Sequence, residues 1–459
     1  MPDSNVMAFL EHGRQLPDKR EAENRSQDFK DIYQKAEEAD LAEQAERCLD
    51  CGNPYCQWKC PLHNHIPNWL DLVQRGKLKA AARTMINTNP LPEICGRVCP
   101  QDRLCEMACT LNTGFGAVTI GNIEKQISDM AVKEGWYEAP IPIDATSGMK
   151  VAVVGSGPAG IGCADYLSRK GVGVTVFEKQ PEIGGLLTFG IPGFKLEKDV
   201  VFKRQEVLES QGITFKTNTE VGKDITFQQL QEEYDAVFLG MGAYQAVDGG
   251  LMDESNPNIL AALDYLIGVT NHNLDLGVAD SEYHDLSGKH VKVFGGGDTA
   301  MDCVRTAIRQ GAASVECVYR RTEEEMPGSK REVQSAKEEG VQFTFYQQPT
   351  AINKTDNGVS IDVEHRDTGD KQTIEADIAI LAFGFRPNPP EWLTSLGIEL
   401  ESDNRIRTFV SEKDAELNQA TSLANIYVGG DMSRGADLVV TAIADGRDAA
   451  KQILSDLSY

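Results

Sequence analysis

The sequence has no long apolar run, no basic leader and little positive charge, and each absence excludes a class of protein. No stretch of its 459 residues approaches the roughly 18 apolar residues of a membrane span. The start, MPDSNVMAFLEHGRQ, lacks the basic and apolar regions of a secretory signal. The formal net charge of −25 argues against a nucleic-acid partner, because phosphates select basic surfaces. We expect a cytoplasmic protein that binds neither membrane nor nucleic acid.

Side chains for hydrolytic chemistry are also scarce. The chain has only seven histidines and no G-x-S-x-G motif, so no nucleophile–base constellation is visible. We nominate no catalytic side chain. The acidic excess is read as a solvated surface that favours solubility, with docking to a basic partner left open.

Cysteine, in contrast, is concentrated in one region. Eight of the eleven cysteines lie between positions 48 and 109, and such clustering in a cytosolic chain indicates metal rather than disulfides. The other three, in apolar surroundings, are expected to be small buried core residues: Cys163, Cys303 and Cys317.

The eight thiols form two runs, CLDCGNPYCQWKCP and CGRVCPQDRLCEMAC. Cys60 and Cys99 are each followed by proline, as in bacterial ferredoxin runs. Zinc ribbons usually show paired C-x2-C knuckles, and here only Cys48 and Cys51 have that form. Two [4Fe–4S] clusters are therefore predicted, with structural zinc as the alternative.

The sequence pattern changes at residue 150, where signals for strands and glycine turns begin. KVAVVGSGPAGIGCADYLSRKGVGVTVFEK reads as strand, glycine turn, helix and strand, and the pattern recurs about 140 residues later as HVKVFGGGDTAMDCVRTAIRQGAASVECVYRR. We predict an all-α iron–sulfur domain followed by two α/β Rossmann-like dinucleotide-binding domains, the NADPH domain inserted in the FAD domain. The expected ranges are 1–147 for the helical domain, 148–285 and 378–459 for the FAD domain, and 286–377 for the NADPH domain.

The first glycine turn, GSGPAG, spans Gly155 to Gly160. Its first glycine permits a tight turn, the second lets a pyrophosphate approach the backbone, and the third lets helix and strand pack closely. Glu178 follows at the end of the next strand, where an acid can accept hydrogen bonds from ribose hydroxyls. Only Lys179 stands beside it as a cation, so this site suits FAD.

The second turn, GGGDTA, has Ala300 in place of the third glycine. The ribose position now reads Arg320–Arg321, and two guanidinium groups suit the 2′-phosphate of NADPH. The alternative is a surface pair facing the acidic run Glu323–Glu325. A flavin beside NADPH implies hydride transfer between the cofactors, for which the protein supplies alignment and electrostatics.

Several longer stretches resemble the small (β) subunits of bacterial NADPH-dependent glutamate synthase, and the resemblance covers nearly the whole chain. It is carried by RCLDCGNPYCQWKCPLHNHIPNW, EICGRVCPQDRLCEMACTLN, GAVTIGNIE, PEIGGLLTFGIPGFKLEK, GGGDTAMDCVRTAIRQGA, YRRTEEEMPGSKREV and DLVVTAIADGR. The N-terminal half of dihydropyrimidine dehydrogenase is similar in plan.

The resemblance implies two sets of cofactor-binding residues. The set implied for FAD is Gly155, Gly157, Pro158, Ala159, Gly160, Glu178, Lys179, Gly185, Leu186, Lys195, Gly430 and Asp431. The set implied for NADPH is Gly296, Gly297, Asp298, Thr299, Ala300, Arg320, Arg321, Ala382, Phe383 and Gly384.

Cluster ligation is predicted to cross between the two runs, because in two-cluster ferredoxins the last cysteine of a run serves the other cluster. One cluster would take Cys48, Cys51, Cys56 and Cys109, and the other Cys60, Cys99 and Cys105. The fourth ligand of the second cluster stays open. Counting thiols gives Cys95, whereas the resemblance to dihydropyrimidine dehydrogenase, in which a glutamine on the next helix is the ligand, gives Glu124. The ordinary reading of Glu124 is a solvated glutamate.

The resemblance also implies a role and a partner. The chain would be the electron-input subunit, oxidising NADPH and passing electrons through its clusters to a large (α) subunit that makes L-glutamate from L-glutamine and 2-oxoglutarate. One alternative is a stand-alone NADPH-dependent reductase of ferredoxin or a pyrimidine reductase subunit. A second is a flavin-binding redox sensor that reduces no acceptor.

Overall fold

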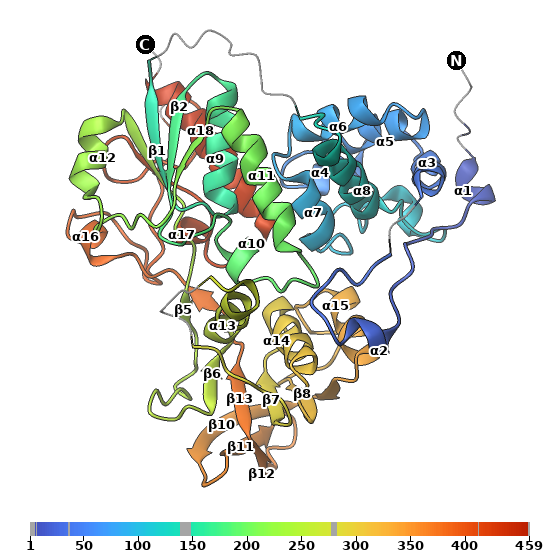
Figure 1. Ribbon diagram of the computed structural model, residues 1–459, viewed down its shortest axis with the longest axis vertical. Coiled ribbons are helices and arrows are strands. Elements are labelled where there is room, and N and C mark those ends of the chain that lie inside the picture. The colour runs from blue at the N-terminus through green and yellow to red at the C-terminus, as the bar shows by residue number, and fades with distance from the viewer. Residues whose placement is uncertain are drawn as a thin grey trace.

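The computed structural model describes residues 5, 7–34, 37–137, 148–276, 282–411 and 413–457. These residues form a helical part and two parts built on parallel sheets (Figure 1). The predicted boundary between residues 147 and 148 lies at the edge of a stretch outside the described residues.

The helical part is built around a core that contains the fully buried Trp69, with Val73, Ile123 and Ile127 packed in the same cluster. In the described residues before 138, the only β-pairing is an isolated bridge between Lys19 and Tyr33. Its elements are α1 (Ala8–Glu11), α2 (Ala22–Arg25), α3 (Glu38–Glu46), α4 (Tyr55–Lys59), α5 (Ile66–Gln74), α6 (Leu78–Ile86), α7 (Pro92–Val98), η1 (Thr110–Asn112) and α8 (Ile120–Lys133).

The first sheet has the strand order β15-β4-β1-β2-β3, and all its pairings are parallel. Its central strands are apolar and buried on both faces, as expected for a parallel sheet covered by helices. The strands are β1 (Lys150–Val154), β2 (Gly173–Phe177), β3 (Thr214–Lys216), β4 (Ala236–Leu239) and β15 (Ile426–Val428). The helices are α9 (Pro158–Arg169), α10 (Leu186–Phe189), α11 (Lys198–Ser210), α12 (Phe227–Glu233), α16 (Glu391–Thr394), α17 (Asp431–Arg434) and α18 (Val439–Leu457).

The second parallel sheet has the order β6-β13-β7-β8-β9, and every strand in it lies between β4 and β15 in the chain. Its elements are β6 (Ile259–Ala261), α13 (Ala262–Leu274), β7 (His290–Phe294), α14 (Asp298–Arg309), β8 (Ser314–Val318), α15 (Lys330–Glu338), β9 (Gln342–Thr344) and β13 (Ile378–Leu381). Two smaller sheets lie in the same stretch of the chain. One is antiparallel and consists of β10 (Gln347–Lys354), β11 (Val359–His365) and β12 (Lys371–Ala376), and the other is the pair β5 (Gln245–Ala246) and β14 (Phe385–Arg386).

The second sheet is wider than the predicted range 286–377. Strand β13 pairs with both β6 and β7, so residues 259–261 and 378–381 belong to the same sheet as the glycine-turn strand. The sequence gives little warning of this, because β6 is a strand of three residues.

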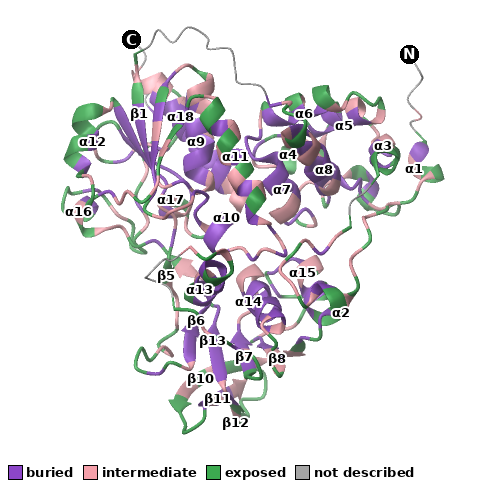
Figure 2. Ribbon diagram, in the orientation of Figure 1, coloured by how far each residue is buried: buried purple, intermediate pink, exposed green. Residues whose placement is uncertain are grey.

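Buried residues are concentrated in the strands and along α9 and α14 (Figure 2). Cys163, Cys303 and Cys317 are completely buried, which confirms that they are core residues. In the part of the chain that the structure describes, no helix is long and apolar enough to cross a membrane.

Buried ion pairs join the three parts. Glu93 of α7 accepts hydrogen bonds from Arg204 of α11, with Nε 2.8 Å from Oε1, and both side chains are fully buried. The N-terminal segment runs from the helical part to the second sheet, where α2 lies beside α15 (Figure 1). There Arg25 Nε donates to Glu339 Oε1 over 3.1 Å. The helical part is therefore anchored to both sheet domains.

Candidate functional site

The first glycine turn lies between β1 and the start of α9. Gly155 has φ of +96°, which favours glycine, and a Cβ at Gly160 would lie 1.9 Å from the Gly155 oxygen. A Cβ at Gly157 would meet nothing within 4 Å, so the backbone there is open to a ligand. This tight turn with one open face at a helix N-terminus fits the pyrophosphate of a dinucleotide.

Two distant segments reach this turn. A Cβ at Gly185 would lie 3.1 Å from Gly157 Cα, and one at Gly430 would lie 2.9 Å from Ala159 Cβ. The fold therefore brings together residues of the expected FAD set that are nearly 280 positions apart. Burial raises the pKa of the neighbouring Asp431 to about 7.

Glu178 also belongs to this site. Its Oε2 accepts hydrogen bonds from the backbone and hydroxyl of Ser156, at 2.9 and 2.6 Å, and its Oε1 accepts one from Gln180 N. The carboxylate thus ties the strand end to the glycine turn. Lys179 lies with its Nζ 5.5 Å from the ring centre of Tyr244.

The second glycine turn follows β7 and opens α14. A Cβ at Gly295 would lie 2.4 Å from Ala382 O, and one at Gly296 would lie 2.6 Å from the Tyr319 ring, whereas Gly297 is open. The turn and the expected Ala382–Gly384 segment are therefore in contact. Asp298, the first residue of the helix, accepts hydrogen bonds from Ser329 N and from Arg103 of the second cysteine run.

Arg320 and Arg321 follow β8, where a ribose phosphate is expected. Arg321 Nε is buried and has no hydrogen-bond partner in the described chain. The acidic run has other partners: Glu323 pairs with Lys337, and Glu325 accepts a hydrogen bond from Thr322 N. A buried guanidinium nitrogen without a protein partner fits an anionic ligand such as a 2′-phosphate.

Lys195 belongs to the expected FAD set, but in the structure it forms an ion pair with a residue of the second sheet domain. Its Nζ lies 2.7 Å from Asp302 Oδ1 of α14, so the side chain reaches from the first sheet domain to the second. Asp302 was not among the site residues predicted from the sequence. Its only signal was an acidic residue on the apolar face of a helix, between Met301 and Cys303.

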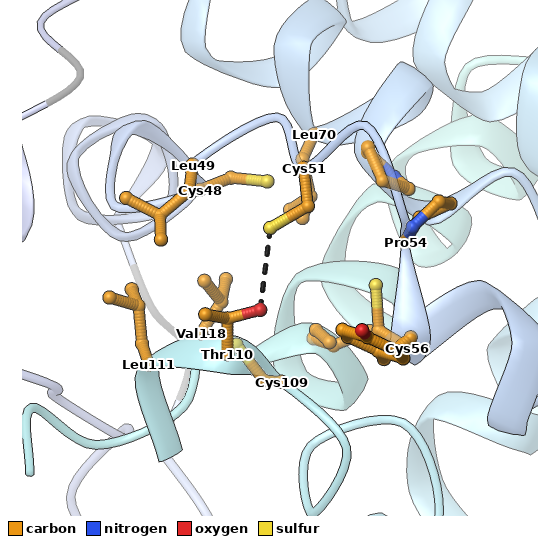
Figure 3. Close-up of a pocket in the computed structure, with 13 residues that line it drawn as sticks. Cys48, Leu49, Cys51, Pro54, Cys56, Leu70, Cys109, Thr110, Leu111 and Val118 are labelled. Atoms are coloured by element: carbon orange, nitrogen blue, oxygen red, sulfur yellow. Dashed lines mark hydrogen bonds between the residues drawn. The ribbon is translucent and has the colours of Figure 1, made fainter. Parts of the chain in front are cut away.

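Four thiols from both cysteine runs border one cavity: Cys48, Cys51, Cys56 and Cys109 (Figure 3). Cys51 Sγ lies 3.4 Å from Thr110 Oγ1. Burial raises the pKa of Cys48 and of Cys56 to about 12, so these thiols stay protonated until a metal displaces the proton. Within the described residues, no group of three or more His, Cys, Asp or Glu side chains is arranged to hold a single metal ion.

The remaining thiols gather around Glu124 of α8. Burial raises the pKa of Cys60 to about 11 and that of Cys105 as well, and the Glu124 carboxylate acts in the same direction on both. A hydrogen bond with Cys95 is the main cause of the raised pKa of Cys99, followed by burial. Cys95 and Glu124 thus both lie close to this group.

Glu124 is not a solvated surface residue. It is 8% exposed, and burial raises its pKa to about 8, although two amides oppose the shift. The two amides belong to Asn64 and Asn89, which donate to Oε1 over 3.0 and 3.1 Å. Neither asparagine was predicted from the sequence as a site residue, and both lie outside the cysteine runs.

A second cavity lies where the parts of the chain meet. The helical part contributes Cys99 and Pro100, the first sheet domain Phe194 and Lys195, and the second sheet domain Asp298. One of the clustered thiols therefore borders a space shared with both dinucleotide-fold domains.

Comparison with known proteins agrees with this division. Residues 25–136 match the family described as dihydropyrimidine dehydrogenase domain II, 4Fe-4S cluster, and residues 149–446 match pyridine nucleotide-disulphide oxidoreductase. The structure of FprA from Mycobacterium tuberculosis in complex with NADPH superposes with a TM-score of 0.55 at 19% identity, covering 67% of this chain and 84% of that chain. Fold and site thus define a pyridine nucleotide oxidoreductase joined to an iron–sulfur domain.

Relatives define the family more closely. The glutamate synthase [NADPH] small chain of Halomonas elongata is 50% identical over 99% of this chain and 98% of its own length. That of Escherichia coli K12 is also 50% identical, over 98% of both chains. The chain belongs to the family of glutamate synthase [NADPH] small chains.

Proposed function

We propose that this chain is the electron-input subunit of an NADPH-dependent glutamate synthase. It would hold NADPH, FAD and two [4Fe–4S] clusters, and deliver electrons to a large subunit that makes L-glutamate from L-glutamine and 2-oxoglutarate. The observation that carries this proposal is the shared cavity, where Cys99 of the thiol group, Lys195 and Asp298 border one space. The flavin supplies hydride acceptance and single-electron release, and the clusters carry single electrons.

The chain's residues hold and orient these groups. The open backbone at Gly157 and the Glu178 carboxylate would hold FAD, with Gly185 and Gly430 closing the turn. Gly297 would receive the pyrophosphate of NADPH at the N-terminus of α14, and Arg321 its 2′-phosphate. The NADPH-binding domain is then the second sheet with its helices, inserted between β4 and β15 of the FAD domain.

We assign the two thiol groups to two clusters. The first would be held by Cys48, Cys51, Cys56 and Cys109, and the second by Cys60, Cys99, Cys105 and Glu124. The first assignment is supported by the common cavity, and the second by the burial of Glu124 and by the effect of its charge on the pKa of each of the three thiols.

The first cluster is the proposed exit for electrons. Tyr55 and Trp58 of α4 lie in the same run as its ligands and are 51% and 54% exposed, with ring centres 5.5 Å apart. Exposed aromatic side chains are enriched in protein interfaces. We therefore expect the large subunit to cover this end of the helical part.

Reconstitution with the large subunit tests the proposal. The pure chain should bind FAD and reduce artificial acceptors with NADPH, without making glutamate. Addition of the large subunit should produce NADPH oxidation that depends on both glutamine and 2-oxoglutarate. If dye reduction occurs but the large subunit neither co-purifies nor couples, whereas a ferredoxin is reduced, the stand-alone reductase is correct. Binding of FAD without any dye reduction would instead indicate a redox sensor.

A further inference from the structure

Two buried amides hold one oxygen of Glu124. Asn64, just before α5, and Asn89, between α6 and α7, are 2% and 1% exposed. Both donate from Nδ2 to Glu124 Oε1, over 3.0 and 3.1 Å. Three separate segments of the helical part therefore converge on a single carboxylate oxygen.

The orientation of each amide is fixed by other donors. Asn64 Oδ1 accepts from Trp69 Nε1 over 3.2 Å and from Thr88 Oγ1 over 3.3 Å. Asn89 Oδ1 accepts from Leu91 N over 3.0 Å. Because each carbonyl oxygen is engaged by donors, each amide must present its NH2 group to the carboxylate.

The second oxygen of Glu124 is left for another ligand. Within the described residues no hydrogen bond to Oε2 is present, although the residue is almost fully buried. A carboxylate that is largely buried is normally paired or bound to metal, and Oε2 is the oxygen of Glu124 that remains for that role. The negative charge of Glu124 contributes to the raised pKa of the thiols in the second group, which are Cys60, Cys99 and Cys105.

We propose that Asn64 and Asn89 are positioning residues for the second cluster: they fix Glu124 through Oε1 and so keep Oε2 available as a ligand. This rests on the proposed ligand role of Glu124. Hydrogen bonds from outer-shell residues orient metal-binding carboxylates, and their loss typically weakens metal binding by about 10- to 100-fold.

Asparagine-to-aspartate substitutions isolate the interaction. Asn64→Asp and Asn89→Asp keep the shape and the acceptor oxygen that Trp69 and Leu91 use. They replace the NH2 group that donates to Glu124 by a carboxylate oxygen, and so also add a negative charge beside Glu124. The control is Asn87→Asp, the same change at an exposed position at the end of α6. All variants are purified anaerobically as full chains, and retained FAD shows that they fold. If Asn89→Asp lacks FAD, Asn89→Ser is used in its place.

The measurements are the iron and sulfide content per FAD, the rate of iron loss to a chelator, and the electron paramagnetic resonance spectrum of the reduced clusters. We expect each Asp variant to lose iron from one cluster about 10- to 100-fold faster than the control and to change the signal of that cluster alone. In a Glu124→Cys background, where the ligand is a thiolate, the same substitutions should have no such effect.

The outcomes separate two failures. If Glu124→Ala retains both clusters with unchanged spectra, Glu124 is not a ligand, and that part of the proposed function falls together with this inference. If Glu124→Ala loses a cluster but both asparagine variants behave like Asn87→Asp, only the positioning role is overturned. Equal effects of the Asp variants in the Glu124 and Glu124→Cys backgrounds would show a packing role and would also overturn it.

Discussion

Lys195 and Asp302 form a buried ion pair that joins the two sheet domains, with Nζ 2.7 Å from Oδ1 and both side chains about one-tenth exposed. Lys195 follows α10 of the first sheet domain, and Asp302 lies on α14, the helix that begins at the second glycine turn. Burial raises the pKa of Asp302 to about 6, so the pair is ionised near neutral pH. The pair therefore links the orientation of one dinucleotide-fold domain to the other.

Removing one partner of this pair should be costly. Asp302→Ala leaves the Lys195 ammonium buried without its partner, which typically costs about 3–5 kcal/mol. We expect a lower melting temperature and slower NADPH-dependent dye reduction, with FAD retained. The double variant Lys195→Met/Asp302→Leu should recover most of the stability, because it leaves no buried charge. A melting temperature of Asp302→Ala equal to that of the parent would contradict the prediction.

Arg320 and Arg321 should set the preference for NADPH over NADH. A charge-assisted bond to the 2′-phosphate contributes about 1.5–3 kcal/mol, so losing one weakens NADPH use by about 10- to 100-fold. The measurement is kcat/KM for both nucleotides in Arg320→Ala and Arg321→Ala. NADH use should change little, since NADH lacks that phosphate; equal losses for both nucleotides would refute the assignment.

Glu339 should make the stability of the protein sensitive to acid. Burial opposes its ionisation, but hydrogen bonds from Arg305 and Arg309 outweigh burial and hold its pKa at about 2, below its ordinary value of 4.5. An acid with a lowered pKa stabilises the fold above its unfolded pKa, and this contribution disappears as the pH falls from about 4.5 toward 2. It amounts to roughly 3 kcal/mol. Melting curves between about pH 3 and pH 6 should show a steep acid limb that is flatter in Glu339→Gln, and parallel curves would argue against this role.

Cys109 tests whether the two runs share ligands. It lies in the second run but borders the cavity of Cys48, Cys51 and Cys56. Cys109→Ser should therefore remove the same cluster that Cys48→Ser removes and leave the other spectrum intact. Cys163→Ser, at a completely buried position among core residues of the first sheet domain, is the matched thiol control. Loss of different clusters in the Cys109 and Cys48 variants would show that each run binds its own.

Trp58 tests the proposed exit surface. Truncation of an aromatic anchor at an interface commonly costs 2 kcal/mol or more, so Trp58→Ala should lower coupled NADPH oxidation with the large subunit by about 30-fold at limiting concentrations. Dye reduction by the isolated chain should not change. Phe409→Ala, at a partly exposed aromatic residue distant in sequence from the cysteine runs, is the control. If both variants couple normally, the large subunit docks elsewhere.

Local features of the sequence were sufficient to predict the class of fold. The glycine turns, the strands before them and the acid or arginine pair after them occur within short segments, and their conformations follow from steric rules that neighbours along the chain impose. The structure forms both turns where the sequence places them, at the starts of α9 and α14. The cysteine runs likewise marked the helical part, because thiol spacing is readable without knowledge of packing.

Contacts between distant segments were decided only by the tertiary structure. The chain alone did not indicate that β6 joins the second sheet, that Lys195 pairs with Asp302, or that Asn64 and Asn89 meet at Glu124. Each depends on which buried polar group finds a partner once the cores have packed, and such groups must be satisfied wherever the fold places them. The sequence by itself determined the two glycine turns and the two thiol runs, which indicate dinucleotide and iron–sulfur cofactors. Packing of its three parts decided which side chains surround the glycine turns and the thiols, because a buried charge or amide takes its partner from whatever segment lies within reach.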